Sequence, residues 1–221
     1  LGILLSAGAI FVTARHIQFD GSYYRARTLD STGNWDGAYQ EITKALDYGA
    51  FDHRAIFLKG LYLQNGNHLS KAEIAYQNAL RAHPNYAHSH HNLGGVYAAQ
   101  GAWKMALTSF KRALEIRPKY VQARIHLGNT YIALGQLNSA MHEFETILQQ
   151  NPNSPEAHGN LGAIYLQQNR FDDAITALKL AILNRPENAE AYNNLALAYE
   201  QTGNTKEAIR AYQRLLEYWR G

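Results

Sequence analysis

The sequence contains no cysteine, which excludes disulfide bonds and thiolate metal sites. It has only five prolines in 221 residues, so helices can run over much of its length without interruption. The net charge is only +3, and the basic residues do not gather into the stripe that is typical of nucleic-acid binders. We therefore expect no DNA or RNA partner. The lack of cysteine also fits a reducing compartment.

Motifs for catalysis and cofactor binding are missing as well. The sequence has no GxxxxGK[ST] or GxGxxG loop for phosphates, no GxSxG nucleophile elbow and no HExxH zinc motif. Its carboxylates are scattered over positions that face outward on the predicted helices, as on a solvated surface. We predict no enzymatic activity and no cofactor for the residues given.

Ten histidines raise the question of a metal site, and three of them lie close together in the run HSHHN. His88 and His91 are three residues apart and can share a helix face, and His126 can approach from the next repeat. A metal site needs further ligands and a supporting shell, and no carboxylate joins this cluster. We therefore predict no metal site, and instead imidazoles on a groove wall that confer some pH sensitivity.

Charged residues are absent from residues 1–14, LGILLSAGAIFVTA, and Arg15 follows directly. This run is shorter than the roughly 20 residues of a membrane-spanning helix. We favour the end of a membrane anchor, because the run is apolar on all sides; the alternative is an apolar helix that caps the first repeat. Arg15, Arg25 and Arg27 weakly favour a cytoplasmic location for the following residues, with a periplasmic or fully cytoplasmic protein as alternatives.

A repeat of 34 residues organises the remaining sequence. Alanine recurs at this interval at Ala38, Ala72, Ala106, Ala140, Ala174 and Ala208. Small residues form a second column at Ala26, Gly60, Gly94, Gly128, Gly162 and Ala196. Further columns hold leucine, at Leu93, Leu127, Leu161 and Leu195, and proline, at Pro84, Pro118, Pro152 and Pro186. The period therefore predicts one structural unit repeated along the chain.

Each unit is predicted to be an antiparallel pair of helices. In residues 87–120, Leu93, Gly94 and Tyr97 share a face of one helix, and Ala106 and Phe110 share a face of a second. Gly101 lies between them, where a helix end favours a left-handed residue; Asn67, Gly135, Asn169 and Gly203 occupy the same place elsewhere. The predicted organisation is an apolar helix over 1–18, a degenerate unit over 19–52, and regular units over 53–86, 87–120, 121–154, 155–188 and 189–221.

This pattern resembles the tetratricopeptide repeat family. The matching residues in one unit are Leu93, Gly94, Tyr97, Gly101, Ala106, Phe110, Ala113 and Pro118. The resemblance covers 53–221 and is weaker over 19–52; Arg25 and Lys59 stand where leucine is expected in the first two units. It implies an all-α fold, a right-handed α-solenoid of stacked antiparallel helix pairs, whose first helices line a concave binding surface.

Carried over position by position, the resemblance gives a set of candidate peptide-binding residues. They are Asn92, His126, Asn160 and Asn194, with His91, Ile125, Asn129, Ile132, Leu166 and Asn193 beside them. A side-chain amide offers a donor and an acceptor, as a peptide unit does, so such a column is similar to the asparagine ladder of O-GlcNAc transferases. The alternative is that these asparagines only help the helix pairs to pack.

The other groove positions are small and apolar, which predicts a peptide ligand with apolar anchors. Some family members hold an acidic C-terminal tail with lysines and asparagines. Of that clamp only Asn129 is present, and Ile125 occupies the neighbouring lysine position. We therefore expect no acidic-tail clamp.

Three functions are compatible with these features. We favour a membrane-tethered scaffold that binds a partner protein or peptide. The alternative is the C-terminal tail of a bacterial membrane enzyme of the O-antigen ligase or polymerase type, and a carbohydrate- or lipid-handling module ranks last. At the C-terminal end, Leu216 and Trp219 either pack within their own unit or are covered by a further partner.

Overall fold

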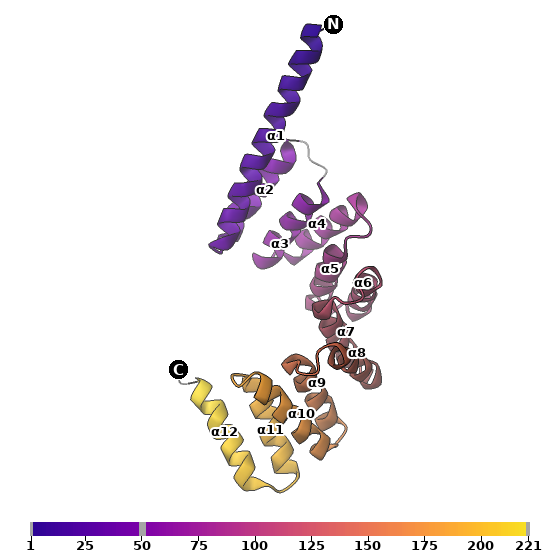
Figure 1. Ribbon diagram of the computed structural model, residues 1–221, viewed down its shortest axis with the longest axis vertical. Helices are drawn as coiled ribbons and strands as arrows, with labels where there is room; N and C mark the ends of the chain where they lie inside the picture. The colour runs from indigo at the N-terminus through magenta and orange to yellow at the C-terminus, as the bar shows by residue number, and fades with distance from the viewer. Residues whose placement is uncertain (1, 49–51, 220–221) are drawn as a thin grey trace. The chain divides into compact units, whose positions relative to one another are not determined.

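The computed structural model describes the backbone of residues 2–48 and 52–219, and the side chains of residues 12, 14–48 and 52–217. These residues form twelve helices and no strand (Figure 1). The chain divides into two compact units, Leu1–Tyr120 and Val121–Gly221. The first contains α1 (Gly2–Ser31), α2 (Trp35–Asp47), α3 (His53–Asn65), α4 (Leu69–Ala82), α5 (Ala87–Ala99) and α6 (Trp103–Ile116). The second contains α7 (Val121–Ala133), α8 (Leu137–Gln150), α9 (Pro155–Gln167), α10 (Phe171–Asn184), α11 (Ala189–Gln201) and α12 (Thr205–Trp219).

The helices pack in consecutive pairs, from α1 with α2 to α11 with α12. Each pair also packs on the next pair within its unit, through α2 and α3, α4 and α5, α8 and α9, and α10 and α11. Stacking is required because one helix pair cannot bury its apolar face alone. The predicted all-α solenoid of stacked helix pairs is confirmed.

Helix α1 is longer than the sequence pattern suggested, and it runs without interruption through the boundary placed at residue 18. The Arg15 side chain donates a hydrogen bond to the Tyr48 carbonyl at 2.9 Å, and so joins the middle of α1 to the end of α2. None of the helices, over the residues described, has the length and apolar character needed to span a bilayer. The side chains of residues 1–11, on which the predicted membrane anchor mainly rests, lie outside the described part.

The turn within each helix pair contains one residue with a positive φ. These residues are Gly33, Asn67, Gly101, Asn169, Gly135 and Gly203, with φ between 59° and 75°. Glycine has no Cβ to clash there, and asparagine tolerates the left-handed region better than most residues. The predicted helix-ending role of the Gly and Asn column is thereby confirmed, and Gly33 extends the column into the first pair.

The alanine column lies at the centre of the helix pairs, where Ala38, Ala72, Ala106, Ala140 and Ala174 are fully buried. The glycine column lets the two helices of a pair approach closely. A Cβ built on Gly94 would lie 2.7 Å from the Phe110 ring, and the equivalent atom on Gly128 would lie 2.6 Å from the Phe144 ring. The side chain on the second helix thus occupies the space that the missing Cβ leaves.

The two cations that replace leucine in the first two repeats are accommodated in different ways. Arg25 is exposed and donates to the Glu41 carboxylate at 2.7 Å and to Ser22 at 2.8 Å. Lys59 is half-buried, and its ammonium lies 5.4 Å from the centre of the Tyr39 ring. Both helices form despite the substitution, because a long cationic side chain can pack its stem and keep its charge near solvent.

Two buried tyrosines differ in how their hydroxyl groups are satisfied. The Tyr62 hydroxyl has no hydrogen-bond partner among the described residues, and burial raises the pKa of Tyr62 to about 12. The Tyr76 hydroxyl donates to Gln64 at 2.8 Å and accepts from Asn92 at 3.3 Å. A buried polar group without a partner costs about 1–3 kcal/mol, whereas a satisfied one contributes about 1 kcal/mol.

We therefore expect Tyr62→Phe to raise the free energy of unfolding by about 1 kcal/mol, and Tyr76→Phe to lower it by about 1–2 kcal/mol. Each variant removes one hydroxyl from a buried ring, so each serves as the control for the other. Urea unfolding followed by circular dichroism measures both. Equal losses of stability in the two variants would contradict the assignment of Tyr62 as an unsatisfied donor.

Candidate functional site

A cleft of about 270 Å³ lies in the second unit, along the first helices of three successive pairs. Its lining comes from α7, α9, α11 and the loop before α11. The residues are Ile125, Asn129, Pro155, Glu156, Gly159, Asn160, Arg185, Asn188, Glu190, Ala191 and Asn194. Four of the ten predicted binding residues, Ile125, Asn129, Asn160 and Asn194, are therefore brought together. Their role in binding a ligand stays a prediction.

Local capping fixes where the cleft-lining helices begin. The Ser154 hydroxyl accepts a hydrogen bond from the Ala157 backbone N–H at 3.3 Å, and Pro155 occupies the first turn of α9. The Asn188 side chain accepts from the Ala191 N–H at 3.0 Å at the start of α11. Such caps satisfy backbone donors that the first turn of a helix leaves unpaired. Asn188 is thus a structural residue at the edge of the cleft.

An ion pair between Glu156 and Arg185 crosses the cleft wall. The Ser154 hydroxyl also donates to Glu156 at 3.3 Å. Burial by itself acts to raise the pKa of Glu156, but hydrogen bonds from its own backbone N–H, Arg185 and Ser154 outweigh that effect and lower the pKa. Glu190 adds an exposed carboxylate to the lining, so the carboxylates outnumber the cations there.

Asn160 and Asn194 occupy the same repeat position on α9 and α11, and Asn129 lies three residues after the corresponding position of α7. Asn160 donates from its side chain to the Glu156 carbonyl at 2.9 Å, one turn back in α9, which leaves its side-chain oxygen available as an acceptor. Asn129 is exposed and Asn194 is half-buried. Each amide can both donate and accept, so together they can bind the N–H and C=O groups of a peptide main chain.

The cleft is more polar than the sequence predicted. The apolar groove positions were expected to dominate the wall, but Ile125 is only 8% exposed, and Leu166 is half-buried against the core of the α9–α12 pairs. Leu166 packs against the core formed by α10, α11 and α12 and does not line the cleft. What remains open to solvent in the cleft is mainly amide and charged groups. The asparagines project from within α7, α9 and α11, whereas Glu156 and Glu190 lie at helix starts and Arg185 lies in the loop.

The remaining predicted residues lie outside this cleft. His126 and Asn193 are exposed on α7 and α11, and Ile132 is half-buried on α7. His91 and Asn92 belong to α5 in the first unit. Asn92 donates to Tyr76 on α4, so here the asparagine joins two neighbouring helix pairs. This is the packing role that was given as the alternative to ligand binding.

Histidines and aromatic rings form a continuous row along one end of the first unit. His53 stacks on His83 with ring centres 4.5 Å apart, and His91 meets Tyr120 at 4.8 Å. The Tyr120 hydroxyl is 2.9 Å from the His91 Nδ1. Burial, followed by the charge of Arg117, lowers the pKa of His88. Burial also lowers the pKa of His53, so the neutral form is favoured for the His53 and His88 rings.

His90 and His158 share one structural role. Each ring Nε2 lies 2.8 Å from the carbonyl of the loop proline six residues upstream, Pro84 or Pro152. Both histidines occupy the same repeat position, so the contact fixes the loop between two pairs. Within the described part of the chain, no three His, Cys, Asp or Glu side chains are grouped closely enough to hold a metal ion.

Sequence reasoning missed the charged residues of the cleft, although the repeat contains a signal for them. Glu156 and Arg185 are 29 residues apart, and the equivalent positions two repeats earlier are His88 and Arg117. The Arg117 guanidinium also lies near its partner, 3.5 Å from the His88 Nε2. Reading these two columns together predicts a contact between a helix start and the loop of the next pair.

The sequence matches three family models, all described as tetratricopeptide repeat. One matches residues 97–159 and 135–186, one matches 164–220, and one matches 55–119. Together these segments span most of the chain. No curated protein sequence matches.

Solved structures with the same fold span nearly the whole chain. PilF of Pseudomonas aeruginosa is 18% identical with a TM-score of 0.79, over 94% of this chain and 95% of its own. A tetratricopeptide repeat protein of Parabacteroides merdae is 19% identical with a TM-score of 0.79, over 91% and 80%. YrrB, a repeat protein with an unusual peptide-binding site, is 22% identical with a TM-score of 0.64, over 80% and 91%. With the matched models, these similarities show that the chain belongs to the tetratricopeptide repeat family.

Proposed function

We propose that this chain binds a polypeptide segment of a partner protein in the cleft of its second unit. The observation that carries the proposal is the convergence of Asn129, Asn160 and Asn194 in one polar cleft formed by three first helices. Amides on successive helices can hold the main chain of an extended peptide at regular intervals, largely independent of its side chains.

The charges of the cleft refine the type of peptide. Arg185 is engaged by Glu156, and Glu190 lies exposed nearby with no cation paired to it among the described residues. An acidic peptide would be repelled by this excess of carboxylates, whereas a neutral or basic one would not. Protein interaction is typical of the tetratricopeptide repeat family, and the similar protein YrrB has a peptide-binding site.

The test compares the wild type with Asn129→Ala/Asn160→Ala/Asn194→Ala. Peptides are selected on the wild type from a displayed random library, and their dissociation constants are measured for both proteins. Each lost hydrogen bond is worth about 1 kcal/mol net, so we expect the triple variant to bind about 10- to 100-fold more weakly. Alanine favours helix, so these substitutions should leave the fold intact.

Asn153→Ala/Asn184→Ala is the matched control, because both residues lie in the second unit but do not line the cleft. We expect it to bind the selected peptides like the wild type. Unchanged binding by the triple variant would show that the amide cleft is not the peptide site. Circular dichroism of each variant separates a lost contact from a lost fold.

A membrane tether through residues 1–14 and a place as the tail of a membrane glycan ligase or polymerase are separate proposals. Both rest on the sequence alone, on the uncharged run before Arg15 and the degenerate unit that follows it. The complete gene tests them. Many predicted spans upstream of Leu1 would favour the enzyme tail, and a single span would favour a tethered scaffold on the cytoplasmic side. A partner that covers Leu216, which is 53% exposed, also remains a proposal; the side chain of Trp219 lies outside the described residues.

A further inference from the structure

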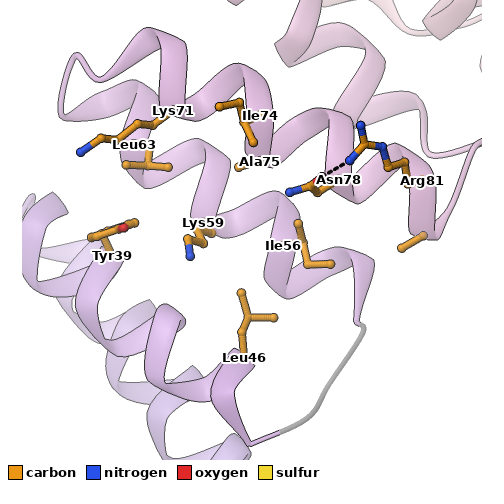
Figure 2. Close-up of a pocket in the computed structure, with 11 residues that line it drawn as sticks. Tyr39, Leu46, Ile56, Lys59, Leu63, Lys71, Ile74, Ala75, Asn78 and Arg81 are labelled. Carbon is orange, nitrogen blue, oxygen red and sulfur yellow. Dashed lines mark hydrogen bonds between the residues drawn. The ribbon is translucent and has the colours of Figure 1, made fainter.

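A second cavity, of about 640 Å³, lies in the first unit on helices that do not contribute to the amide cleft. It runs between α2 and α4, the second helices of two successive pairs, with α3 beneath (Figure 2). Its lining consists of Tyr39, Leu46, Ile56, Lys59, Leu63, Lys71, Ile74, Ala75, Asn78, Arg81 and Ala82. We call this cavity the α2–α4 groove.

The groove has an apolar floor, and every charged side chain that lines it is basic. Ile74 is an isoleucine that is 58% exposed, and Leu46, Ile56 and Tyr39 are half-buried around it. Three of the lining side chains are basic, and none is a carboxylate. An exposed aliphatic side chain beside uncompensated positive charge indicates a surface that a partner of opposite charge covers.

The cations of the groove are not neutralised by the helices around it. Among the described residues, Lys59 and Lys71 form no ion pair, and Arg81 donates to the uncharged Asn78 side chain at 2.9 Å. Glu41 of α2 and Glu73 of α4 do not line the groove. Glu41 pairs with Arg25 and Lys44, and Glu73 accepts from Gln77 at 3.1 Å and from Gln100 at 3.3 Å.

The equivalent groove of the next pair differs in these respects. Its lining includes Leu93 where the α2–α4 groove has Lys59, and it includes Glu115, which pairs with Arg112 at 2.8 Å. Lys59, at a position that holds leucine in the four later repeats, therefore gives the α2–α4 groove its cation at mid-length. Figure 2 shows Lys71 and Arg81 toward opposite ends of α4, with Lys59 between α3 and α2.

The spacing of these groups identifies the shape of the occupant. At a rise of about 1.5 Å per residue, Lys71 and Arg81 lie about 15 Å apart along α4. Charge spread over that length suits a ligand that carries several acidic groups in a row. A lipid-like ligand with one anionic head group would instead need the basic side chains of the groove to be gathered at one end.

The apolar and polar positions that α4 contributes to the lining recur every three or four residues, from Lys71 through Ile74 and Asn78 to Arg81. A second helix laid alongside has the same period, so its side chains can fit between them, whereas an extended strand has a period of two residues. We propose that the α2–α4 groove docks an acidic amphipathic helix of a partner protein. Its apolar stripe covers Ile74 and Leu46, and its flanking carboxylates meet Lys59, Lys71 and Arg81.

The C-terminal helix α12 of a second copy is a poor occupant. Its apolar face is open to solvent, and Ile209 and Leu216 are more than half exposed. Its charged residues include Lys206, Arg210 and Arg214 against Glu207 and Glu217, so basic groups outnumber acidic ones. It would bring like charge to the groove, which opposes association.

The probe for the test is a fluorescein-labelled, hydrocarbon-stapled helical peptide of about 14 residues with leucines along one face and glutamates on both flanks. A second peptide has glutamine in place of each glutamate, and a third has the leucines scrambled. Fluorescence anisotropy measures binding to the full chain. We expect the acidic amphipathic peptide to bind at least about tenfold more tightly than either comparison peptide, and its affinity to fall as salt rises.

Lys71→Glu/Arg81→Glu reverses two exposed charges of the groove, and Ile74→Ser removes its exposed apolar side chain. We expect Lys71→Glu/Arg81→Glu to weaken binding of the acidic peptide at least about tenfold, and Ile74→Ser to weaken it about threefold or more. Lys206→Glu/Arg210→Glu, which reverses two exposed charges on α12, is the matched control and should bind like the wild type. Circular dichroism confirms that each variant is folded.

Several outcomes would overturn the proposal. Equal affinity for the acidic and glutamine peptides, or equal binding by wild type and Lys71→Glu/Arg81→Glu, would show that the groove does not select an acidic helix. Sedimentation with phosphatidylglycerol vesicles that depends on Lys71 and Arg81, without peptide binding, would assign the groove to a lipid surface. The amide-cleft triple variant should bind this peptide normally, so failure here and failure of the proposed function are distinguishable.

Discussion

Gly94→Ala is expected to lower the free energy of unfolding by about 2 kcal/mol, whereas Gly95→Ala should raise it by about 0.5–1 kcal/mol. The two glycines are neighbours in α5, and either substitution adds one methyl group to the same helix. The added Cβ at Gly94 would lie 2.7 Å from the Phe110 ring, but the one at Gly95 has no neighbour closer than the Gln64 side chain at 3.9 Å.

The physical reason for the difference is the position of Phe110. Its ring is fully buried between α5 and α6 and cannot move aside without displacing its own neighbours. The helices must therefore separate to admit the methyl group, and overpacking of this kind costs about 1–3 kcal/mol. At Gly95 only the gain in helix propensity remains. Urea unfolding of the two variants measures the contrast, and equal stability would show that α5 and α6 do not need close approach at Gly94.

Arg124→Ala is expected to destabilise the second unit by about 2–3 kcal/mol. Arg124 on α7 donates to Glu143 on α8 at 2.6 Å, and the two side chains are only 17% and 13% exposed. Removing the arginine leaves the Glu143 carboxylate largely desolvated without its partner. The expected loss of stability is larger than for an exposed ion pair, because little solvent is available to screen or rehydrate the remaining charge.

Two further variants separate the charge effect from the packing effect. Arg210→Ala removes one member of a pair with Glu207, whose side chains are 63% and 41% exposed, and should change stability by less than about 0.5 kcal/mol. Arg124→Met/Glu143→Leu replaces the ion pair by apolar side chains and should recover most of the loss. If the double variant is no more stable than Arg124→Ala, the unpaired Glu143 carboxylate is not the source of the loss.

The amide cleft was predictable in part. Asn160 and Asn194 follow from one column of the repeat, because equivalent positions on stacked helices face the same side, and Asn129 follows from a neighbouring column three residues further on. Glu156 and Arg185 do not follow from one column, because their contact joins the start of one helix to the loop after the next. The apolar part of the cleft was overestimated because Ile125 is almost fully buried in the wall and Leu166 packs against a neighbouring core instead of lining the cleft.

The sequence by itself determined the helix pairs, their turns and their close contacts. A period of 34 residues repeats each local requirement, such as a left-handed residue at Gly101 or a missing Cβ at Gly94, often enough to be recognised. Only the tertiary structure decided which side chains remain open once the pairs stack. The amide cleft and the cationic α2–α4 groove each arise between helices of different pairs, where burial and charge depend on every neighbouring helix and not on one repeat alone.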